Sequence, residues 1–158
     1  MRFFLLDQVT AIVPGESARG IKNVSLTDEV LHDHFPDFPV MPGVLVIEAA
    51  AQLAGFLLEC TLNNGNEPVR RAVLVQVRDA KFYRPAEPGD QIELCATLSN
   101  ALETAAQVAV TAEVKGERVM RGGLTFMMKA VPSEKVHEQR RSLYRIWTRT
   151  LALPFEIR

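Results

Sequence analysis

Hydrophobic residues at every second position predict that much of the chain forms strands. The clearest stretch lies between residues 104 and 115, where Val108, Val110, Ala112 and Val114 follow this period. A period of two is typical of an antiparallel sheet with one buried face. The predicted strands are residues 3–13, a second extended segment that ends at Leu26 after a Pro14-Gly15 turn, and residues 70–82, 91–100, 104–115 and 117–129.

Residues 43–62 have a different pattern, in which apolar side chains point in every direction. Pro42 stands where a helix favours proline, at its first position, and Asn63-Asn64-Gly65 is a stop signal. The helix predicted between them has about five turns. A helix that is apolar all round is buried all round. The two patterns together predict an α+β fold in which a long central helix is wrapped by an antiparallel β-sheet.

Length and composition limit the classes of protein. At 158 residues the chain is long enough for one domain with a substantial core. It is 47% hydrophobic and 23% charged, and its formal net charge of -1 provides no basic field of the kind that nucleic-acid binding needs. The apolar stretch at residues 3–6 ends at Asp7 and is too short for a signal-peptide core, so the cytoplasm is the expected location.

The two cysteines, Cys60 and Cys95, stand alone in the sequence. They have no metal-ligand spacing and no second pair with which to build a disulfide framework. Cysteines in a cytoplasmic protein stay reduced. We therefore expect two buried thiols, no disulfide and no metal site.

The character of the chain changes near Val131-Pro132. We expect residues 1–130 to form the domain and residues 131–158 to form a C-terminal extension. A helical period in the extension predicts a basic amphipathic helix that packs its apolar stripe on the sheet or on a neighbouring subunit. Docking to an acidic carrier protein or to a membrane surface is the less favoured alternative. The stripe consists of Leu143, Ile146, Trp147 and Leu151, and the basic positions are Arg140, Arg141, Arg145 and Arg149.

Two polar residues, Glu48 and Gln52, interrupt the apolar helix four positions apart and therefore share one of its faces. Burying a carboxylate costs several kcal/mol unless it is paired or neutralised. A glutamate in this position either reaches solvent or is kept for chemistry, for example as a general acid. Gln52 is interpreted as a prop that hydrogen-bonds Glu48 or a backbone carbonyl.

The segment before the helix supplies a second candidate group. Three prolines between residues 32 and 42 exclude both a helix interior and a central strand, so this segment is a shaped loop, and it contains His34. The first-turn N–H groups of Gly43 and Val44 have no intrahelical acceptor and carry the positive end of the helix dipole. They are candidates to hold a carbonyl oxygen that gains negative charge.

The stretch from His34 to Gln52, HFPDFPVMPGVLVIEAAAQ, resembles the active-site signature of bacterial 3-hydroxyacyl-[acyl carrier protein] dehydratases. Flanking stretches near residues 4–7, 22–24 and 80–90 agree, so that the likeness covers roughly residues 3–130. The resemblance implies the hot-dog fold and a homodimer or higher oligomer in which two protomers share each active site. It also implies an acyl carrier protein as partner and no cofactor, because the substrate arrives on phosphopantetheine.

The resemblance also implies residue roles. His34 corresponds to the catalytic histidine, Glu48 to the catalytic carboxylate, Gly43 to the backbone donor for the thioester oxygen and Gln52 to a residue that supports the carboxylate. Glutamate at position 48 is more similar to the branch that only dehydrates than to the branch that also isomerises. A basic cluster lies near where the family receives its carrier, with Arg70, Arg71, Lys81 and Arg84 as candidate contacts and Arg78 among them.

The sequence departs from the family at position 37, where aspartate replaces the usual glycine. Aspartate tolerates positive φ, so the loop can keep its shape, but the new charge affects substrate entry. The expected reaction is dehydration of a 3-hydroxyacyl thioester in fatty-acid, polyene or polyketide synthesis. The alternatives are a non-catalytic hot-dog partner subunit or carrier-binding module, and a hot-dog acyl thioesterase that activates water.

Overall fold

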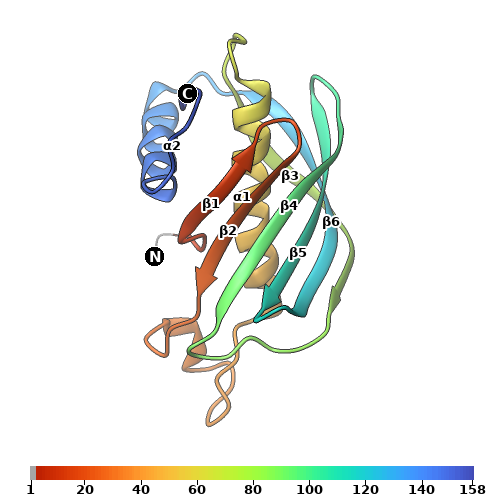
Figure 1. Cartoon of the computed structure of the whole chain (residues 1–158), viewed down its shortest axis with the longest axis vertical. Helices are drawn as coiled ribbons and strands as arrows, with labels where there is room; N and C mark the ends of the chain where they lie inside the picture. The colour runs from red at the N-terminus through yellow and green to blue at the C-terminus, as the bar shows by residue number, and fades with distance from the viewer. Residues whose placement is uncertain (1–2) are drawn as a thin grey trace.

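Helix α1 lies at the centre of the computed structural model, which describes residues 3–158, and a six-stranded antiparallel sheet curves around it (Figure 1). The strand order is β1-β2-β4-β5-β6-β3, so β1 and β3 are the two edge strands. This arrangement confirms the predicted hot-dog fold. The elements are β1 Gln8–Val13, β2 Ser17–Asn23, a 3-10 turn at Glu29–Leu31, α1 Gly43–Leu62, β3 Arg70–Phe82, β4 Gln91–Ala101, β5 Ala105–Val114, β6 Glu117–Ala130 and α2 Glu134–Trp147.

The sheet faces α1 with the residues that the period-two pattern selects. In β5 the buried positions alternate, and Val108, Val110, Ala112 and Val114 are each 2% exposed or less. They belong to the same buried apolar cluster as Leu53 of α1, which is fully buried. Burial of this apolar area is the main favourable term in folding.

The start of the first strand differs from the prediction. β1 begins at Gln8, one residue after Asp7, whose N–H donates to the Ile21 carbonyl of β2 at 3.0 Å, and residues 3–6 lie outside the sheet. The reason is a side chain of α1: the Gln52 Oε1 accepts hydrogen bonds from the N–H groups of Leu5 (2.9 Å) and Leu6 (3.2 Å). The segment is therefore held across α1 instead of extending the sheet.

The composition of α1 predicted a helix that is buried all round, and this prediction was wrong for its first turns. Val44, in the first turn, is 69% exposed, and the burial becomes continuous only from Leu53 to Cys60. By length and composition alone, α1 could cross a membrane, but most of its residues are buried inside this protein. The open first turns are the part of α1 nearest to the proline-rich loop.

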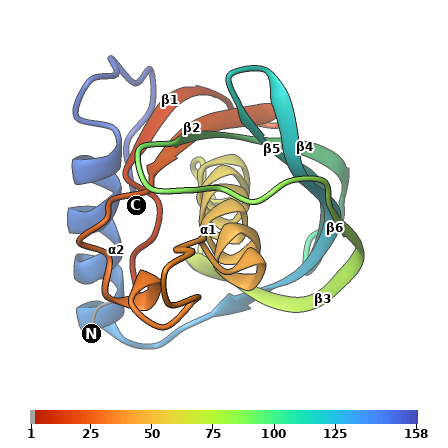
Figure 2. The ribbon, with the colours of Figure 1, turned by 90° about the horizontal axis from the view of Figure 1, so that it is seen from below.

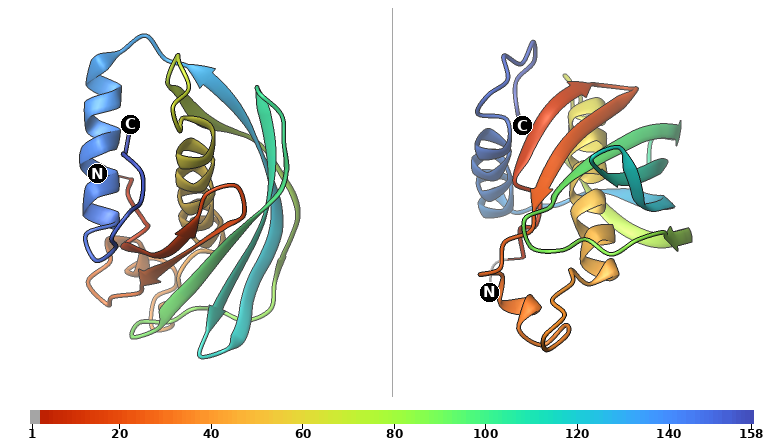
Figure 3. Two further views of the ribbon diagram at one scale, coloured as in Figure 1. Left: turned by 45° about the horizontal axis from the view of Figure 1, so that its top comes forward. Right: turned by 60° about the horizontal axis from the view of Figure 1, so that its bottom comes forward.

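Helix α2 covers the side of α1 that the sheet leaves open (Figures 2 and 3). It contacts α1 through aromatic side chains: the ring centroids of Phe56 and Tyr144 are 4.9 Å apart, and Trp147 stacks on Tyr144 at 5.5 Å. The apolar stripe predicted for this helix was partly wrong. Tyr144 and Trp147 are buried, whereas Ile146 is 59% exposed. The burial of Tyr144 depends on a hydrogen-bond partner that the period alone does not reveal.

Candidate active site

Glu48 lies half-buried on α1, and Gln52 holds its carboxylate. The Gln52 Nε2 donates to the Glu48 Oε1 at 2.9 Å and to the Phe3 carbonyl at 2.8 Å, while its Oε1 accepts from the N-terminal segment. The amide of Gln52 is thereby fixed in one orientation. Within residues 3–158, Glu48 forms no ion pair. One oxygen of its carboxylate is therefore free for another partner.

His34 is oriented by its own loop. Its Nδ1 lies 2.8 Å from the Val40 carbonyl oxygen, and because a carbonyl can only accept, Nδ1 carries the proton in this contact. The other ring nitrogen, Nε2, then has a free lone pair, as a general base requires. Phe35 stacks on the imidazole with the ring centroids 4.2 Å apart. The predicted loop histidine is thus held in the tautomer that suits proton abstraction.

Residue 37 takes the backbone conformation expected for the family glycine. Asp37 has φ 62°, in the left-handed region that aspartate tolerates better than most residues. On either side of it, Phe35 and Phe38 exchange backbone hydrogen bonds of 2.9 and 3.0 Å. The tight loop keeps its shape with aspartate in place of glycine, and the side chain of Asp37 is exposed.

The first turn of α1 provides the predicted backbone donors. The Pro42 carbonyl accepts from the N–H groups of Leu45 and Val46, so the preceding N–H groups, of Gly43 and Val44, have no acceptor within the helix. The Phe82 ring approaches Gly43 so closely that a Cβ there would lie 2.6 Å from its Cε1. Glycine is needed at this position for Phe82 to pack over the helix terminus.

A cleft of about 270 Å³ contains the carboxylate of Glu48. Its floor is one face of α1, formed by Glu48, Ala51, Gln52, Gly55 and Glu59 at the spacing of a helical stripe. The small side chains in the middle of this stripe leave room above the helix. The walls are Phe3 and Phe4, Ala72 and Leu74 of β3, Phe126 of β6, and Arg140 and Tyr144 of α2.

Glu59 at the far end of this stripe is a buried carboxylate that the sequence interpretation missed. It is 3% exposed and accepts from the Arg71 Nη1 (2.7 Å), the Tyr144 hydroxyl (2.7 Å) and the Ala72 N–H (3.0 Å). Its position eleven residues after Glu48, inside the same apolar helix, was the available signal. The partners that neutralise it come from β3 and α2 and could not be read from the pattern.

Burial beside Glu59 changes two other acids. The pKa of the Tyr144 hydroxyl is raised well above its usual value, first by burial and then by the charge of Glu59. The pKa of the Cys60 thiol is raised to about 12 for the same two reasons, in the same order. Both groups therefore stay protonated at neutral pH. Cys60 is a buried free thiol as expected, whereas Cys95 is only half-buried.

The predicted basic cluster is not one surface. Arg71 is 3% exposed and ion-paired with Glu59, so its assignment as a carrier contact was wrong. Arg70 and Lys81 lie at opposite ends of β3, about 36 Å apart because eleven residues of extended strand separate them. Arg70 pairs with Glu103. Lys81 lies near the catalytic end, as does Arg84, which pairs with Asp90 and Glu117; these two remain candidates.

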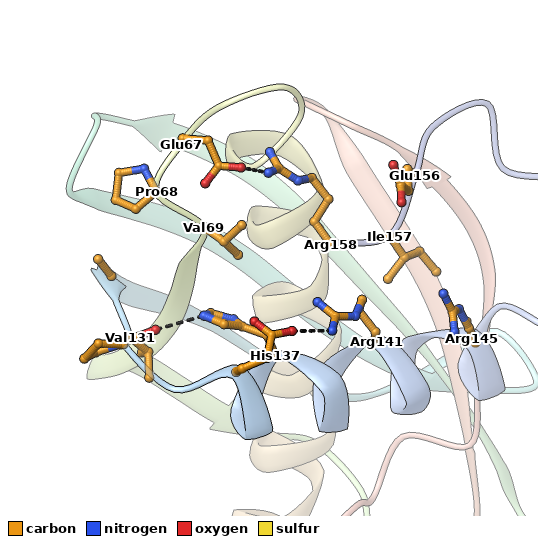
Figure 4. A pocket seen from close by; sticks show the side chains of 13 residues that line it. Glu67, Pro68, Val69, Val131, His137, Arg141, Arg145, Glu156, Ile157 and Arg158 are labelled. Atoms are coloured by element: carbon orange, nitrogen blue, oxygen red, sulfur yellow. Dashed lines mark hydrogen bonds and ion pairs between the residues drawn. The ribbon is translucent and has the colours of Figure 1, made fainter.

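A larger cavity, of about 800 Å³, lies elsewhere, between α2, the turn before β3 and the C-terminal segment (Figure 4). Two ion pairs lie within its lining: Arg141 pairs with Glu134, and Arg158 with Glu67. His137 also lines it, with Nε2 2.8 Å from the Val131 carbonyl and Nδ1 facing Arg71. None of the motif residues lines this cavity, so the candidate chemistry lies in the smaller cleft.

Within residues 3–158, no group of three or more His, Cys, Asp or Glu side chains is placed to hold a metal ion. The cleft is lined by the carboxylate of Glu48, whereas the His34 imidazole on the neighbouring loop and the N–H groups of Gly43 and Val44 at the α1 terminus are not among its lining residues in one chain. Together these can move protons and stabilise an oxyanion.

A family model described as a FabA-like domain matches residues 1–123. The chain belongs to the FabA-like family. A relative from Rickettsia bellii, named 3-hydroxyacyl-[acyl-carrier-protein] dehydratase FabZ, is 36% identical over 127 residues, which are 80% of this chain and 86% of the relative. Helix α2 lies beyond the part that the family model matches.

Solved structures of low sequence identity share the fold of this FabA-like chain. The dehydratase heterocomplex ApeI:P from Xenorhabdus doucetiae superposes with a TM-score of 0.69 at 19% identity and covers 87% of this chain and 90% of its own. A hot-dog-like protein from Thermanaerovibrio acidaminovorans has a TM-score of 0.62 at 20% identity, with 90% and 96% covered. These likenesses agree with the hot-dog architecture.

Proposed function

We propose that this member of the FabA-like family is a hydro-lyase that converts a 3-hydroxyacyl thioester, carried by acyl carrier protein, to the trans-2-enoyl thioester in fatty-acid synthesis. The observation that carries the proposal is the state of the two side chains. His34 presents a free Nε2 because its Nδ1 is bound to Val40, and Glu48 keeps a free oxygen because, among residues 3–158, Gln52 alone forms a hydrogen bond with its carboxylate. The relatives named as dehydratases support the same reaction.

The reaction requires one base, one acid and one oxyanion donor. The Nε2 of His34 removes a proton from C2, and the N–H of Gly43, with that of Val44 beside it, stabilises the enolate-like thioester oxygen. Protonated Glu48 donates its proton to the 3-hydroxyl as the C3–O bond breaks, so that water leaves and a C2–C3 double bond forms. The proton that His34 took up is then transferred to Glu48 before the next turnover, so atoms and charges balance without a redox partner, and no cofactor is needed beyond the phosphopantetheine arm on which the substrate arrives.

We infer that a second copy completes the site, because neither His34 nor Gly43 is among the residues that line the Glu48 cleft in one chain. The edge strand β3 offers a surface for a second copy: Val73, Val75 and Val77 are 42–50% exposed on a strand whose outer edge has no partner. An exposed apolar edge strand of this length is a pairing surface. In the proposed homodimer His34 faces the partner's Glu48, and Lys81 and Arg84 receive the acidic carrier in the cytoplasm.

Mixing two inactive variants tests both the reaction and the shared site. His34→Ala and Glu48→Gln, purified separately, each lose hydration of a crotonyl thioester, measured as loss of the conjugated absorbance and gain of water by mass. If the sites are shared, partial unfolding and joint refolding restores about a quarter of wild-type activity, since half of the dimers are mixed and each has one intact site. If the refolded mixture is no more active than either variant alone, the shared site is contradicted.

The same assay separates the two alternatives. A thioesterase releases free thiol from the acyl thioester and adds no water to the double bond. A non-catalytic partner subunit shows neither reaction as a purified homodimer and becomes active only with a second hot-dog protein. The orientation of His34 by Val40 favours an enzyme over a non-catalytic subunit, because it presents Nε2 as a proton acceptor. The relatives named as dehydratases favour dehydration over thioester hydrolysis.

A further inference from the structure

The cleft that contains Glu48 has an outer wall built by helix α2, which lies outside the residues that the family model matches. Figure 2 shows α1 enclosed by the sheet on most of its circumference and by α2 on the remaining side. Arg140 and Tyr144, one helical turn apart on α2, both line the cleft. The extension therefore shapes the space into which the acyl chain of a substrate held at Glu48 would extend.

The two ends of the cleft are polar and its middle is apolar. Glu48 and Glu59 stand eleven residues apart on α1, about 16 Å along the helix. Ala51, Gly55 and Leu74 lie between these ends. Since consecutive carbons of an extended chain advance by about 1.25 Å, the cleft holds about a dozen carbons before it reaches Glu59.

The charges at the far end do not cancel within the cleft. Glu59 is neutralised by Arg71, and Tyr144 donates its proton to the same carboxylate. Arg140 is half-buried and forms no ion pair with any residue from 3 to 158. The Arg140 guanidinium thus lines the cleft without an ion pair, next to the apolar side chains of its middle part. An alkyl chain that ends there would desolvate it without compensation.

We propose that Arg140 is a specificity-determining residue that binds an acidic group at the far end of the acyl chain, and that this enzyme prefers 3-hydroxyacyl thioesters with a terminal carboxylate to those with a terminal methyl group. Arginine binds carboxylates through paired, charge-assisted hydrogen bonds. Ala51 and Gly55 accommodate the methylene chain between the two polar ends. This inference rests on the proposed dehydratase function.

The test compares two 2-enoyl thioesters of equal length that are long enough to span the cleft beyond C3, a 2-hexadecenoyl thioester and its analogue with a carboxylate in place of the terminal methyl group. The rate with each is divided by the rate of the same variant with the crotonyl thioester, which is too short to reach Arg140. A general loss of folding or of catalytic power then cancels from the ratio. The variants are Arg140→Met, Arg140→Lys and, as the matched control on α2, Arg145→Met, whose side chain is exposed and lines the other cavity.

Wild type and Arg145→Met are expected to favour the carboxylate-terminated chain by about tenfold in kcat/KM, the discrimination that one charge-assisted hydrogen-bonded pair provides. Arg140→Met should lose this preference, and Arg140→Lys should keep part of it. An unchanged ratio in Arg140→Met, or a wild-type preference for the methyl-terminated chain, would overturn the inference. Dissociation of the Arg140→Met dimer would also overturn it, because Arg140 would then serve a protein contact. Failure to hydrate even the crotonyl thioester would instead reject the proposed function.

Discussion

The two carboxylates of α1 occupy the same helical face and have opposite environments. Glu48 is half-buried and receives one hydrogen bond, from Gln52. Glu59 is buried and receives three, from two side chains and a backbone N–H, with a guanidinium 2.7 Å away. Both oxygens of Glu59 are engaged, one by the Ala72 N–H and the other by Arg71 and Tyr144, so neither is free to exchange a proton with a substrate. The difference teaches that availability, and not burial alone, separates a catalytic acid from a structural one.

The largest effect should come from the available carboxylate. Glu48→Gln keeps the size of the side chain and removes its proton, so turnover should fall by about 10²–10⁴-fold, the usual contribution of a positioned acid. Hydration of a crotonyl thioester measures this loss, and the melting temperature serves as the folding control. Turnover within a factor of two of wild type would assign the acid to another residue.

Substitution at the other end of the helix should act on stability. Glu59→Gln leaves the Arg71 guanidinium buried without its counter-charge and turns an amide N–H towards groups that donate. The free energy of unfolding should fall by about 3–5 kcal/mol, measured by chemical denaturation at neutral pH.

The matched control is Glu138→Gln, an exposed glutamate on α2, which should change the same free energy by no more than about 0.5 kcal/mol. If the two substitutions change the free energy of unfolding equally, the contacts of Glu59 do not stabilise the fold as proposed.

Alkaline pH should lower the free energy of unfolding through Cys60, the residue next to Glu59. Cys60 has a native pKa of about 12 against 9.0 for an ordinary thiol, so its stabilising contribution is complete below pH 9 and is lost as pH rises towards 12. Between pH 8 and pH 10.5 the loss should be about 2 kcal/mol. Cys60→Ala should remove this part of the pH dependence, whereas Cys95→Ala should retain it; identical slopes in both variants would contradict the assignment.

The smallest expected effect concerns the link between α2 and α1. Tyr144→Phe removes one hydrogen bond to Glu59 and keeps the aromatic contacts with Phe56 and Trp147. The free energy of unfolding should fall by about 1.5 kcal/mol. Tyr83→Phe, at a tyrosine that is 46% exposed, is the control and should leave it unchanged. A larger loss than that of Glu59→Gln would place the main anchor of α2 on Tyr144.

Much of the architecture followed from local pattern. The bounds of α1 were predicted correctly because Pro42 and the Asn63-Asn64-Gly65 stop act within one turn of the helix ends. The strands β3 to β6 were predicted to within one residue at each end, since the period of two reports which face is buried. The first strand began later than predicted because Gln52, distant in sequence, binds the segment before it.

By itself, the sequence determined the fold class, the family motif and the positions of His34 and Glu48, because each is a property of a short continuous stretch. Only the tertiary structure decided that Arg71 is internal and that the tail contributes Tyr144 and Arg140 to the cleft. The Tyr144–Glu59 contact joins residues 85 apart, and the Arg71–Glu59 contact joins residues 12 apart in different elements. Periodicity shows which face of an element is buried, but the partner on the other side is selected by packing and charge compensation among distant segments.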